Sequence, residues 1–345
     1  MKADATDADI RGVCQLIESH KLEPLLMPGN VMAIGIPSEV PTDLREPLQQ
    51  QLQILPGVSK VTQVSRPFKL ASREFNPHST IVEAAGVKIG GVSLSVMAGP
   101  CSIESYEQLR SAAQIVKAAG ATVLRGGAFK PRTSPYSFQG LALEGLQIMQ
   151  SVGREFGIAT VSEVMSPDMV ETVAAHVDIL QIGARSMQNF PLLIEAGKSK
   201  KPTLLKRGMW APIDDFLLAA EYVLAHGNPN VILCERGITP LDKSYTRNTL
   251  DLAAVPVLKE YSHLPVIVDP SHGTGVAKYV PTMSYAAIAA GADGLMIEVH
   301  PNPREALSDA AQALSPAVFA EMMSKLREYA AVQGRTLCDV GTITL

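Results

Sequence analysis

The sequence predicts an α/β fold: a (β/α)8 TIM barrel preceded by a small N-terminal ferredoxin-like α+β domain. From Thr80 onward, short apolar strands alternate with helix patterns in eight units, as a barrel of about 250 residues requires. The 345 residues, 46% of them hydrophobic, supply the core of a barrel with an appended domain. Charged side chains also recur where strands end, which is where barrels carry their chemistry. A doubly wound open sheet is the competing fold.

Residues 1–66 are expected to form the small domain. Apolar residues at helical spacing predict two helices, namely Ile10, Val13, Cys14 and Ile17 in the first and Leu44, Leu48 and Leu52 in the second. Short strands are expected over 25–27, 31–36 and 58–64. The resulting order α-β-β-α-β matches a ferredoxin-like unit without its first strand. The polar residues 67–79 are predicted as a linker, which leaves residues 80–345 for the barrel.

The barrel region opens with a predicted hairpin over 81–84 and 87–89. The eight barrel strands are then expected over 93–98, 121–124, 158–164, 178–182, 202–206, 230–235, 265–269 and 294–299. Each is short and apolar, and each is followed by a helix pattern, from 106–119 after the first strand to 316–332 after the last. In such a barrel the carboxyl ends of all the strands meet at one mouth.

Composition excludes several kinds of function. The net charge of −4 and pI of about 6.0 argue against a general nucleic-acid-binding surface. No apolar run reaches the roughly 18 residues of a membrane helix, and the N-terminus is acidic rather than signal-like. Four widely spaced cysteines favour reduced thiols over a disulfide framework. We therefore expect a cytoplasmic protein that binds neither nucleic acid nor membrane.

Basic residues gather at the ends of the second, fourth, fifth and sixth strands. The loop after 121–124 carries Arg125 and Lys130, and the later strand ends contribute Arg185, Lys206 and Arg236. Taken singly, each would be a solvated or salt-bridged residue. At equivalent places in successive units of a net-acidic protein, they predict one site for a substrate with phosphate or carboxylate groups.

The remaining strand ends carry residue types that bind metals. Cys101 follows the first strand, His272 follows the seventh, Glu298 ends the eighth, and Asp309 lies in the loop beyond. Barrel closure brings the eighth strand beside both the first and the seventh, so these residues should converge. The mixed set suits one divalent ion, Mn²⁺, Fe²⁺, Zn²⁺ or Co²⁺, and the spacing does not choose among them. His300 is a rival ligand.

Several motifs together resemble a known enzyme family. The segments AGPCS, LRGGAFKPRTSPYSFQG, QIGAR, LLKRG, ILCERG, DPSHGTG and IEVHP are similar to those of 3-deoxy-D-arabino-heptulosonate-7-phosphate (DAHP) synthases, in particular the type I-beta subgroup. The KPRTS stretch is specific, because the sister enzyme 3-deoxy-D-manno-octulosonate-8-phosphate synthase has Asn where Pro131 stands. The resemblance implies condensation of phosphoenolpyruvate with erythrose 4-phosphate, the first step of the shikimate pathway.

The resemblance also implies roles for individual residues. The phosphoenolpyruvate site would comprise Arg125, Lys130, Gly183, Ala184, Arg185, Lys206 and Arg236, the erythrose 4-phosphate site Pro131, Arg132 and Thr133, and the metal site Cys101, His272, Glu298 and Asp309. We assign Lys130 as the proton donor and Glu163 as the residue that positions water. We further expect a homotetramer whose activity is inhibited when tyrosine or phenylalanine binds to its N-terminal domains. A packing role for these domains, which the missing strand favours, is the alternative.

Two other classes of function stay open at this point. A Schiff-base aldolase would use Lys206 as a covalent nucleophile, although Arg207 and anionic ligands beside it favour a charged lysine. A non-catalytic effector-binding protein would have the N-terminal domain but no need for the metal-type residues and the cationic set.

Overall fold

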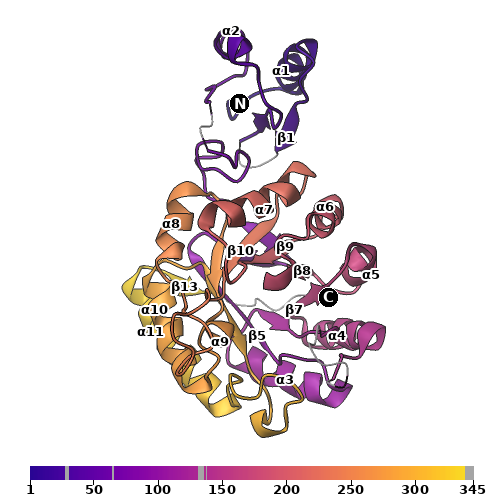
Figure 1. Ribbon diagram of the computed structural model, residues 1–345, viewed down its shortest axis with the longest axis vertical. Helices are drawn as coiled ribbons and strands as arrows, with labels where there is room; N and C mark the ends of the chain where they lie inside the picture. Colours follow the sequence, from indigo (N-terminus) through magenta and orange to yellow (C-terminus); the bar gives the residue numbers. More distant parts are fainter. Residues whose placement is uncertain (28–30, 64–65, 131–135, 137, 339–345) are drawn as a thin grey trace.

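Eight parallel strands close into a barrel in the computed structural model, which describes residues 1–27, 31–63, 66–130, 136 and 138–338 (Figure 1). The strands are β5 (Ser93–Gly99), β6 (Val123–Arg125), β7 (Ala159–Val164), β8 (Ile179–Ile182), β9 (Thr203–Lys206), β10 (Val231–Glu235), β11 (Val266–Val268) and β12 (Gly294–Glu298). Consecutive strands pair in parallel, and β12 pairs with β5, with Gly294 opposite Ser95 and Glu298 opposite Gly99. This last pairing closes the ring, so the predicted barrel is confirmed and the open sheet is excluded.

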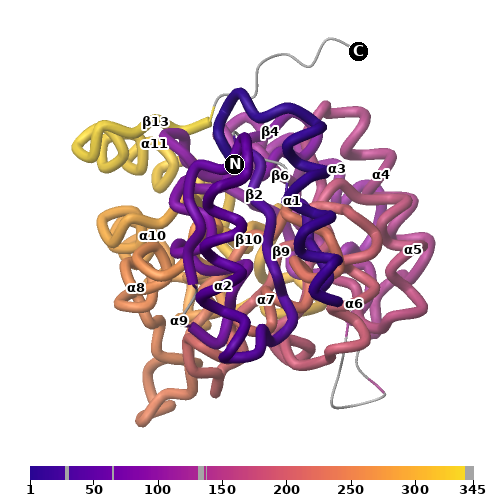
Figure 2. Tube along the Cα trace, turned by 90° about the horizontal axis from the view of Figure 1, so that it is seen from above, coloured from indigo at the N-terminus to yellow at the C-terminus, as the bar shows by residue number. Residues whose placement is uncertain are grey.

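Helices surround the barrel on its outer side (Figures 1 and 2). They are α3 (Tyr106–Ala118), α4 (Ala142–Phe156), α5 (Val170–Ala174), α6 (Phe190–Lys198), α7 (Ile213–Ala225), α8 (Ala254–Tyr261), α10 (Val280–Ala289) and α11 (Pro316–Val332), and the short α9 (Pro270–Thr274) directly follows β11. In α3, Leu109, Ala113 and Val116 recur on one buried face, and the Ser105 side chain caps the first turn. No helix in the described ranges is long and apolar enough to cross a bilayer.

The inside of the barrel is filled by apolar side chains from alternate strand positions, including Met97, Ile232 and Met296. A hairpin of β3 (Val82–Ala84) and β4 (Val87–Ile89) adds Val82 and Ile89 to the same cluster. Because this hairpin leads directly into the start of β5, it plugs the end of the barrel where the strands begin. The opposite end, where the strands finish, is left for chemistry. Near the end of the chain, β13 (Thr336–Leu337) pairs with the first residues of β5, at the end of the barrel where the strands begin.

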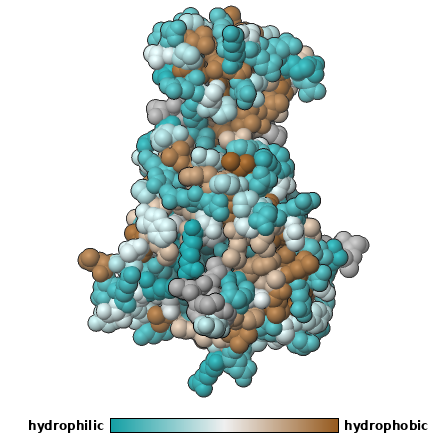
Figure 3. Space-filling view, turned by 45° about the vertical axis from the view of Figure 1, so that its right-hand side comes forward, coloured by the Kyte–Doolittle hydropathy of each residue, from teal (hydrophilic) through white to brown (hydrophobic). Residues whose placement is uncertain are grey.

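The N-terminal unit, indigo in Figure 1, forms a separate lobe at the end of the molecule beyond α7 and α8, and this lobe projects at the top of the space-filling view in Figure 3. It consists of α1 (Asp7–Ser19), β1 (Leu25–Met27), β2 (Ala33–Gly35) and α2 (Thr42–Gln53), with β1 and β2 antiparallel. Thr6 and Asp9 form a capping box at the start of α1. The lobe has its own apolar cluster, which includes Ile17 and Leu48, so its core is distinct from the barrel core.

The strand predicted over 58–64 is wrong for the part that the structure describes, since residues 58–63 form no strand. The Gln53 side chain binds this segment instead: its Oε1 accepts from Val61 N at 2.9 Å and its Nε2 donates to Ser59 O at 3.4 Å. These bonds take backbone groups that a strand would pair. Val58 and Val61 still pack into the apolar cluster of the lobe, which explains their strand-like pattern.

The segment predicted as a linker packs against the barrel. Phe68, Leu70 and Ala71 are buried in the main barrel cluster. The backbone N–H groups of Leu70 and Ala71 donate to the Glu221 carboxylate of α7 at 2.8 and 2.9 Å. His263 Nε2 lies 2.7 Å from Leu70 O. This short stretch therefore attaches the N-terminal unit to the barrel near α7 and α8.

Candidate active site

A cavity of about 190 Å³ opens where the barrel strands end. It brings together these residues predicted from the sequence: Cys101, Arg125, Lys130, Glu163, Gly183, Ala184, Arg185, Lys206, Arg236, His272 and Asp309. Gln181, Met209 and Arg247 line it as well. Glu298 lies fully buried beside this lining. Pro131, Arg132 and Thr133 lie outside the described residues. Side chains from distant strands thus meet at one mouth because the barrel closes.

Three cations form the inner wall of the cavity. Arg125 at the end of β6, Lys206 at the end of β9 and Arg236 directly after β10 are each buried. Arg125 Nη1 donates to Pro100 O at 2.8 Å and to Glu298 Oε1 at 3.1 Å. Burial lowers the pKa of Arg236 from its ordinary value. Arg125 Nε and Arg236 Nη1 are buried without a hydrogen-bond partner among the described residues.

Asp269 links the cations to the metal-type residues. Its Oδ2 accepts from Lys206 Nζ at 2.6 Å and from His272 Nδ1 at 2.7 Å. Its Oδ1 also accepts from His272 N at 2.9 Å, which fixes the start of α9. Burial alone would raise the pKa of Asp269, but the hydrogen bonds from His272 and the positive charge of Lys206 hold it well below its usual value. The carboxylate therefore stays ionised between both groups.

The metal-type residues lie together on the other side of the mouth. Ligand atoms of Cys101, Glu298 and Asp309 all lie within 4.8 Å of one another. Cys101 Sγ is 3.2 Å from Asp309 Oδ2, and His272 Nε2 is 3.4 Å from Glu298 Oε1. His300 does not join them, because its Nε2 faces Glu104 Oε2 at 3.4 Å. The rival ligand is therefore not supported.

Burial and neighbouring charges together shift the pKa values of Cys101, Asp309 and His272. Burial and the nearby Glu298 carboxylate raise the pKa of the Cys101 thiol. Burial would also raise the pKa of Asp309, but the positive charges around it and the hydrogen bond from Cys101 hold it below its usual value. Burial lowers the pKa of His272, which favours the neutral imidazole that binds metals. With Nδ1 held by Asp269, the Nε2 atom of His272 is the one available as a ligand.

Glu163 is held against a glycine. Gln181 Nε2 donates to Glu163 Oε2 at 3.1 Å. A Cβ atom on Gly183 would lie 2.2 Å from Glu163 Oε1, so only glycine leaves room for the carboxylate at this position. Glu163 is half-buried at the edge of the cavity.

Lys130 and Arg185 complete the predicted set. Lys130 Nζ donates to the carbonyl of Cys101 and lies 3.1 Å from its Sγ. A Cβ atom on Gly127 would lie 2.5 Å from Lys130 Nζ, so this glycine makes room for the ammonium group. Arg185 is exposed at the cavity edge. Lys130 therefore lies beside a metal-type residue, and Arg185 lies at the exposed edge of the cavity.

Sequence reasoning missed four polar residues of this site, the first of them Gln181, which binds Glu163. Asp269 bridges Lys206 and His272, Gln312 Nε2 donates to Glu298 Oε2 at 2.8 Å, and Arg247 lines the cavity. Asp269 had a signal, because it ends a predicted strand and begins the DPSHGTG motif. Gln312 and Arg247 lie in loops, where no periodicity indicates which way a side chain points.

Known proteins resemble the chain over nearly its whole length. The sequence profile described as the DAHP synthetase I family matches residues 76–333. A phospho-2-dehydro-3-deoxyheptonate aldolase of Thermotoga maritima is 45% identical over 335 residues, 97% of this chain and 98% of that protein. A crystal structure of the Thermotoga maritima DAHP synthase matches with a TM-score of 0.78 and 43% identity, over 98% of both chains. A truncated form of 3-deoxy-D-arabino-heptulosonate 7-phosphate synthase from Thermotoga maritima matches with a TM-score of 0.73 and 44% identity, over 79% of this chain and 99% of that one.

These matches agree with the geometry. The profile spans the whole barrel from β3 to α11, including every strand end that contributes to the cavity. The full-length relative extends the likeness through the N-terminal lobe. The chain belongs to the DAHP synthetase I family.

Proposed function

We propose that the cavity at the barrel mouth is the active site in which this chain acts as a DAHP synthase. Members of the family condense phosphoenolpyruvate with erythrose 4-phosphate to give DAHP and phosphate, at the entry to the shikimate pathway. The residues below are assigned their roles on the basis of the contacts and charges of this site.

The observation that carries the proposal is a pair of buried guanidinium atoms without partners. Arg125 Nε and Arg236 Nη1 make no hydrogen bond with the described residues. A buried donor left without a partner costs about 1–3 kcal/mol, so these atoms are suited to an acceptor that comes from outside. The phosphate and carboxylate oxygens of phosphoenolpyruvate are such acceptors.

The inner cations orient the first substrate. Arg125, Lys206 and Arg236 hold the two anionic groups of phosphoenolpyruvate, and Lys130 and Arg185 extend the positive wall. The backbone of Gly183 and Ala184 lines the same wall. With its charge offset and its position fixed, the enol carbon faces the aldehyde of the second substrate. Pro131, Arg132 and Thr133, which lie outside the described residues, are proposed to bind that second substrate.

Cys101, His272, Glu298 and Asp309 are proposed to hold one divalent ion. Thiolate, imidazole and carboxylate ligands together suit Mn²⁺, Fe²⁺, Zn²⁺ or Co²⁺. The Asp269 carboxylate on His272 Nδ1 is the kind of outer partner that orients a metal-binding histidine. When bound, the ion supplies Lewis-acid polarisation of the aldehyde carbonyl.

Two residues of the cavity lining are proposed to donate a proton and to position a water molecule. The Lys130 ammonium group lies beside Cys101 and donates a proton to the oxygen that becomes negative when the C–C bond forms. Attack by the enol leaves a cationic carbon that bears the phosphate ester. Glu163 positions a water molecule that adds to this carbon, and the resulting hemiketal phosphate breaks its C–O bond to release phosphate.

Release of phosphate tests this function. The purified enzyme should release phosphate from phosphoenolpyruvate with erythrose 4-phosphate, and much less with arabinose 5-phosphate. EDTA should abolish the reaction, and a divalent transition metal should restore it. Equal rates with both sugars would contradict the assignment of the second substrate. Full activity after verified removal of metal would contradict the metal assignment.

The pairing of Lys206 argues against the Schiff-base alternative. Lys206 Nζ donates to Asp269 Oδ2 at 2.6 Å in a buried ion pair, so this nitrogen is held by the carboxylate rather than presented to a carbonyl carbon. Borohydride treatment in the presence of substrate should therefore leave the protein unmodified. A covalent adduct on Lys206 would overturn this assignment.

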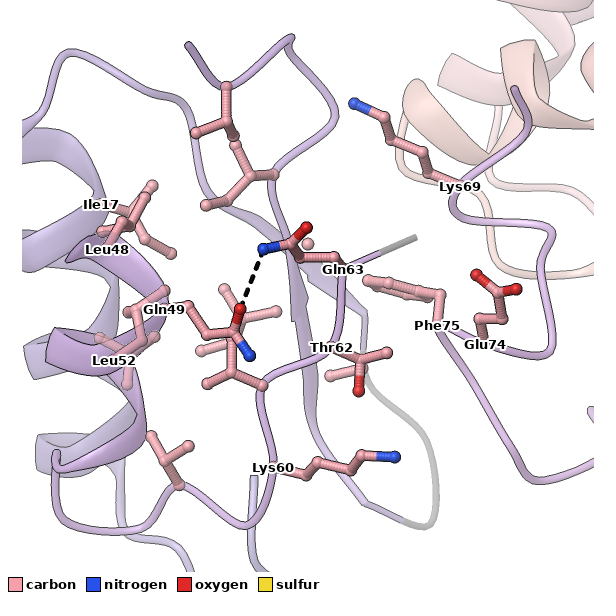
Figure 4. Close-up of a pocket in the computed structure, with 18 of the residues that line it drawn as sticks. Ile17, Leu48, Gln49, Leu52, Lys60, Thr62, Gln63, Lys69, Glu74 and Phe75 are labelled. Carbon is pink, nitrogen blue, oxygen red and sulfur yellow. Dashed lines mark hydrogen bonds between the residues drawn. The ribbon is translucent and has the colours of Figure 1, made fainter. Parts of the chain in front are cut away.

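We also propose a division into a regulatory domain over 1–66, a connecting segment over 67–79 and a catalytic barrel over 80–345. The separate apolar cluster of the lobe supports this division. In the lobe, a cavity of about 490 Å³ lies between the two helices and residues 69–75 (Figure 4). Apolar side chains such as Ile17 and Leu52 form one wall, and Lys69 and Glu74 lie opposite. Such a lining suits an amino acid with a large side chain.

Tyrosine or phenylalanine is the proposed inhibitor, acting through the N-terminal domains of a homotetramer of the type I-beta kind. The test compares the full chain with a chain beginning at Thr80, each assayed with either amino acid at millimolar concentration. Inhibition of the full chain alone supports regulation. A full chain that ignores both amino acids leaves the lobe with a packing role.

The four cysteines are free thiols, which supports a reducing, cytoplasmic setting.

A further inference from the structure

We propose that Glu235 is a positioning residue for phosphoenolpyruvate, because its buried carboxylate fixes the backbone from which the Arg236 side chain enters the cavity. The proposal rests on the proposed function, since it concerns a cation assigned to the first substrate of that reaction. Glu235 is the last residue of β10, and Arg236 follows it directly. Arg236 lines the cavity, whereas Glu235 does not. Glu235 therefore acts on the substrate through its neighbour.

The Glu235 carboxylate is fully buried, and both of its oxygens accept hydrogen bonds. Oε1 accepts from Gly237 N at 2.6 Å and, over a longer distance of 3.4 Å, from Asp251 N. Oε2 accepts from Arg207 Nη1 at 3.0 Å. A proton on either oxygen would face an N–H donor, so this arrangement fits the ionised carboxylate.

The bond from Gly237 N fixes the course of the chain at Arg236. It joins the Glu235 side chain to the backbone of Gly237, and the ring of atoms that it closes includes Arg236. Gly237 has a φ of +93°, and a Cβ atom on it would lie 2.7 Å from Asn248 Cβ. Only glycine therefore lets the chain pass so close to the neighbouring loop. The direction in which the Arg236 side chain leaves the backbone depends on this bond.

Arg207 holds the other oxygen of the carboxylate. Its Nη1 donates to Asp251 Oδ2 at 2.8 Å as well as to Glu235, and its Nε donates to Ala211 O at 2.9 Å. The Arg207 side chain is 7% exposed. Because the guanidinium is itself anchored to two loops, the Glu235 carboxylate has a fixed partner.

The ion pair spans two neighbouring strand ends. Lys206 ends β9 and lines the cavity, and Arg207 follows it, just as Arg236 follows Glu235 at the end of β10. Successive side chains along a strand point to opposite sides. The ion pair of Arg207 and Glu235 therefore lies behind the two cations that face the substrate, and it ties these cations together from the side away from the cavity.

Arg236 needs this support because part of its head group has no protein partner. Its Nη1 is buried without a hydrogen bond to any described residue, whereas Lys206 Nζ is held by Asp269 at 2.6 Å. A buried ion pair adds little net stability compared with apolar residues of similar volume. Stability alone therefore does not account for Arg207 and Glu235, whereas the placement of Arg236 does.

The experiment compares Glu235→Gln with Asp251→Asn in the metal-loaded enzyme. An amide has the shape of a carboxylate but only one acceptor oxygen, so it keeps the bond from Gly237 N or the bond from Arg207, not both. We expect kcat/KM for phosphoenolpyruvate to fall roughly 10- to 100-fold, as for a displaced substrate-binding group. The KM of phosphoenolpyruvate should rise, and the KM of erythrose 4-phosphate should stay nearly unchanged.

Asp251→Asn is the matched control, because it also breaks an ion pair of Arg207 but leaves the bond between Glu235 and Gly237 N in place. Its steady-state kinetics should match those of the wild type, although urea unfolding should show both variants to be less stable. If both variants raise the KM of phosphoenolpyruvate equally, or neither does, Glu235 has only a structural role and the proposal is overturned. A wild-type enzyme that releases no phosphate from phosphoenolpyruvate with erythrose 4-phosphate would instead refute the proposed function.

A double-mutant cycle tests whether the effect passes through Arg236. The dissociation constant of phosphoenolpyruvate is measured by isothermal titration calorimetry for Glu235→Gln, Arg236→Ala and the double variant. If Glu235 acts through Arg236, Glu235→Gln should change this constant little once Arg236→Ala is present. The same fold-change in both backgrounds would contradict the proposal. Glu235→Asp, which keeps the charge on a side chain one methylene shorter, should also weaken phosphoenolpyruvate binding, and it keeps the test decisive if Glu235→Gln is unstable.

Discussion

Replacing Asp269 by Asn should remove the charged link between the cation Lys206 and the metal-type residue His272. The carboxylate is fully buried and joins Lys206 Nζ at 2.6 Å to His272 Nδ1 at 2.7 Å. The amide keeps the shape but loses the charge, which leaves the buried ammonium group without its counter-ion. Breaking a buried ion pair costs about 3–5 kcal/mol. Because the amide oxygen still accepts one hydrogen bond, we expect a loss of stability near the lower end of that range.

The same change should weaken metal binding. Loss of the carboxylate partner of a metal-binding histidine lowers metal affinity about 10- to 100-fold. The assay is titration of the metal-depleted enzyme with Co²⁺, followed by the absorption of the Co²⁺–thiolate bond, with urea unfolding in parallel. Asp251→Asn is the matched control, because Asp251 pairs with the buried Arg207 at 2.8 Å at the same end of the barrel. Asp251→Asn should lower stability but leave Co²⁺ affinity unchanged. Wild-type Co²⁺ affinity in Asp269→Asn would refute the reasoning.

Three further outcomes are expected. Gly183→Ala should displace Glu163 and lower kcat, since the added Cβ would lie 2.2 Å from Glu163 Oε1; unchanged steady-state kinetics would contradict this. His272→Ala should lower bound metal, measured by elemental analysis, together with turnover, whereas normal metal content with lost turnover would point to acid–base chemistry instead. Burial lowers the pKa of His263 from 6.5 to about 4. Between these two pH values the His263 imidazole is therefore protonated in the unfolded chain but neutral in the folded chain. The free energy of unfolding should therefore fall by up to about 3 kcal/mol as the pH drops from about 6.5 to 4. Urea unfolding of His263→Gln should lack this part of the pH dependence, and parallel curves for both proteins would count against it.

The sequence alone determined the barrel and the place of its chemistry. Each strand is a short apolar run, and each helix has an apolar face, so local periodicity was enough to locate them. Parallel strands that close into a ring bring their carboxyl ends to one mouth. Residues as far apart as Arg125 and Asp309 were therefore predicted to meet without any coordinates, because both follow strand ends.

Local pattern was insufficient where tertiary contacts compete with it. Val58 and Val61 look like strand residues. Gln53, however, binds the backbone of Ser59 and Val61, and both valines pack into the apolar cluster of the lobe. The segment around Leu70 looks like a polar linker, yet Glu221 and the barrel core hold it. In both cases the partner lies on another element, and composition does not reveal it.

The pairing of the site residues was decided only by the tertiary structure. The sequence placed cations and metal-type residues at one mouth but gave no link between them. Asp269 provides that link across 63 positions to Lys206 and across one helical turn to His272. Arg247 reaches Asp309 across 62 positions, along a path that Gly275 opens. Periodicity fixes which face a residue occupies, whereas the distance between two side chains depends on loop paths and rotamers that the closed barrel sets.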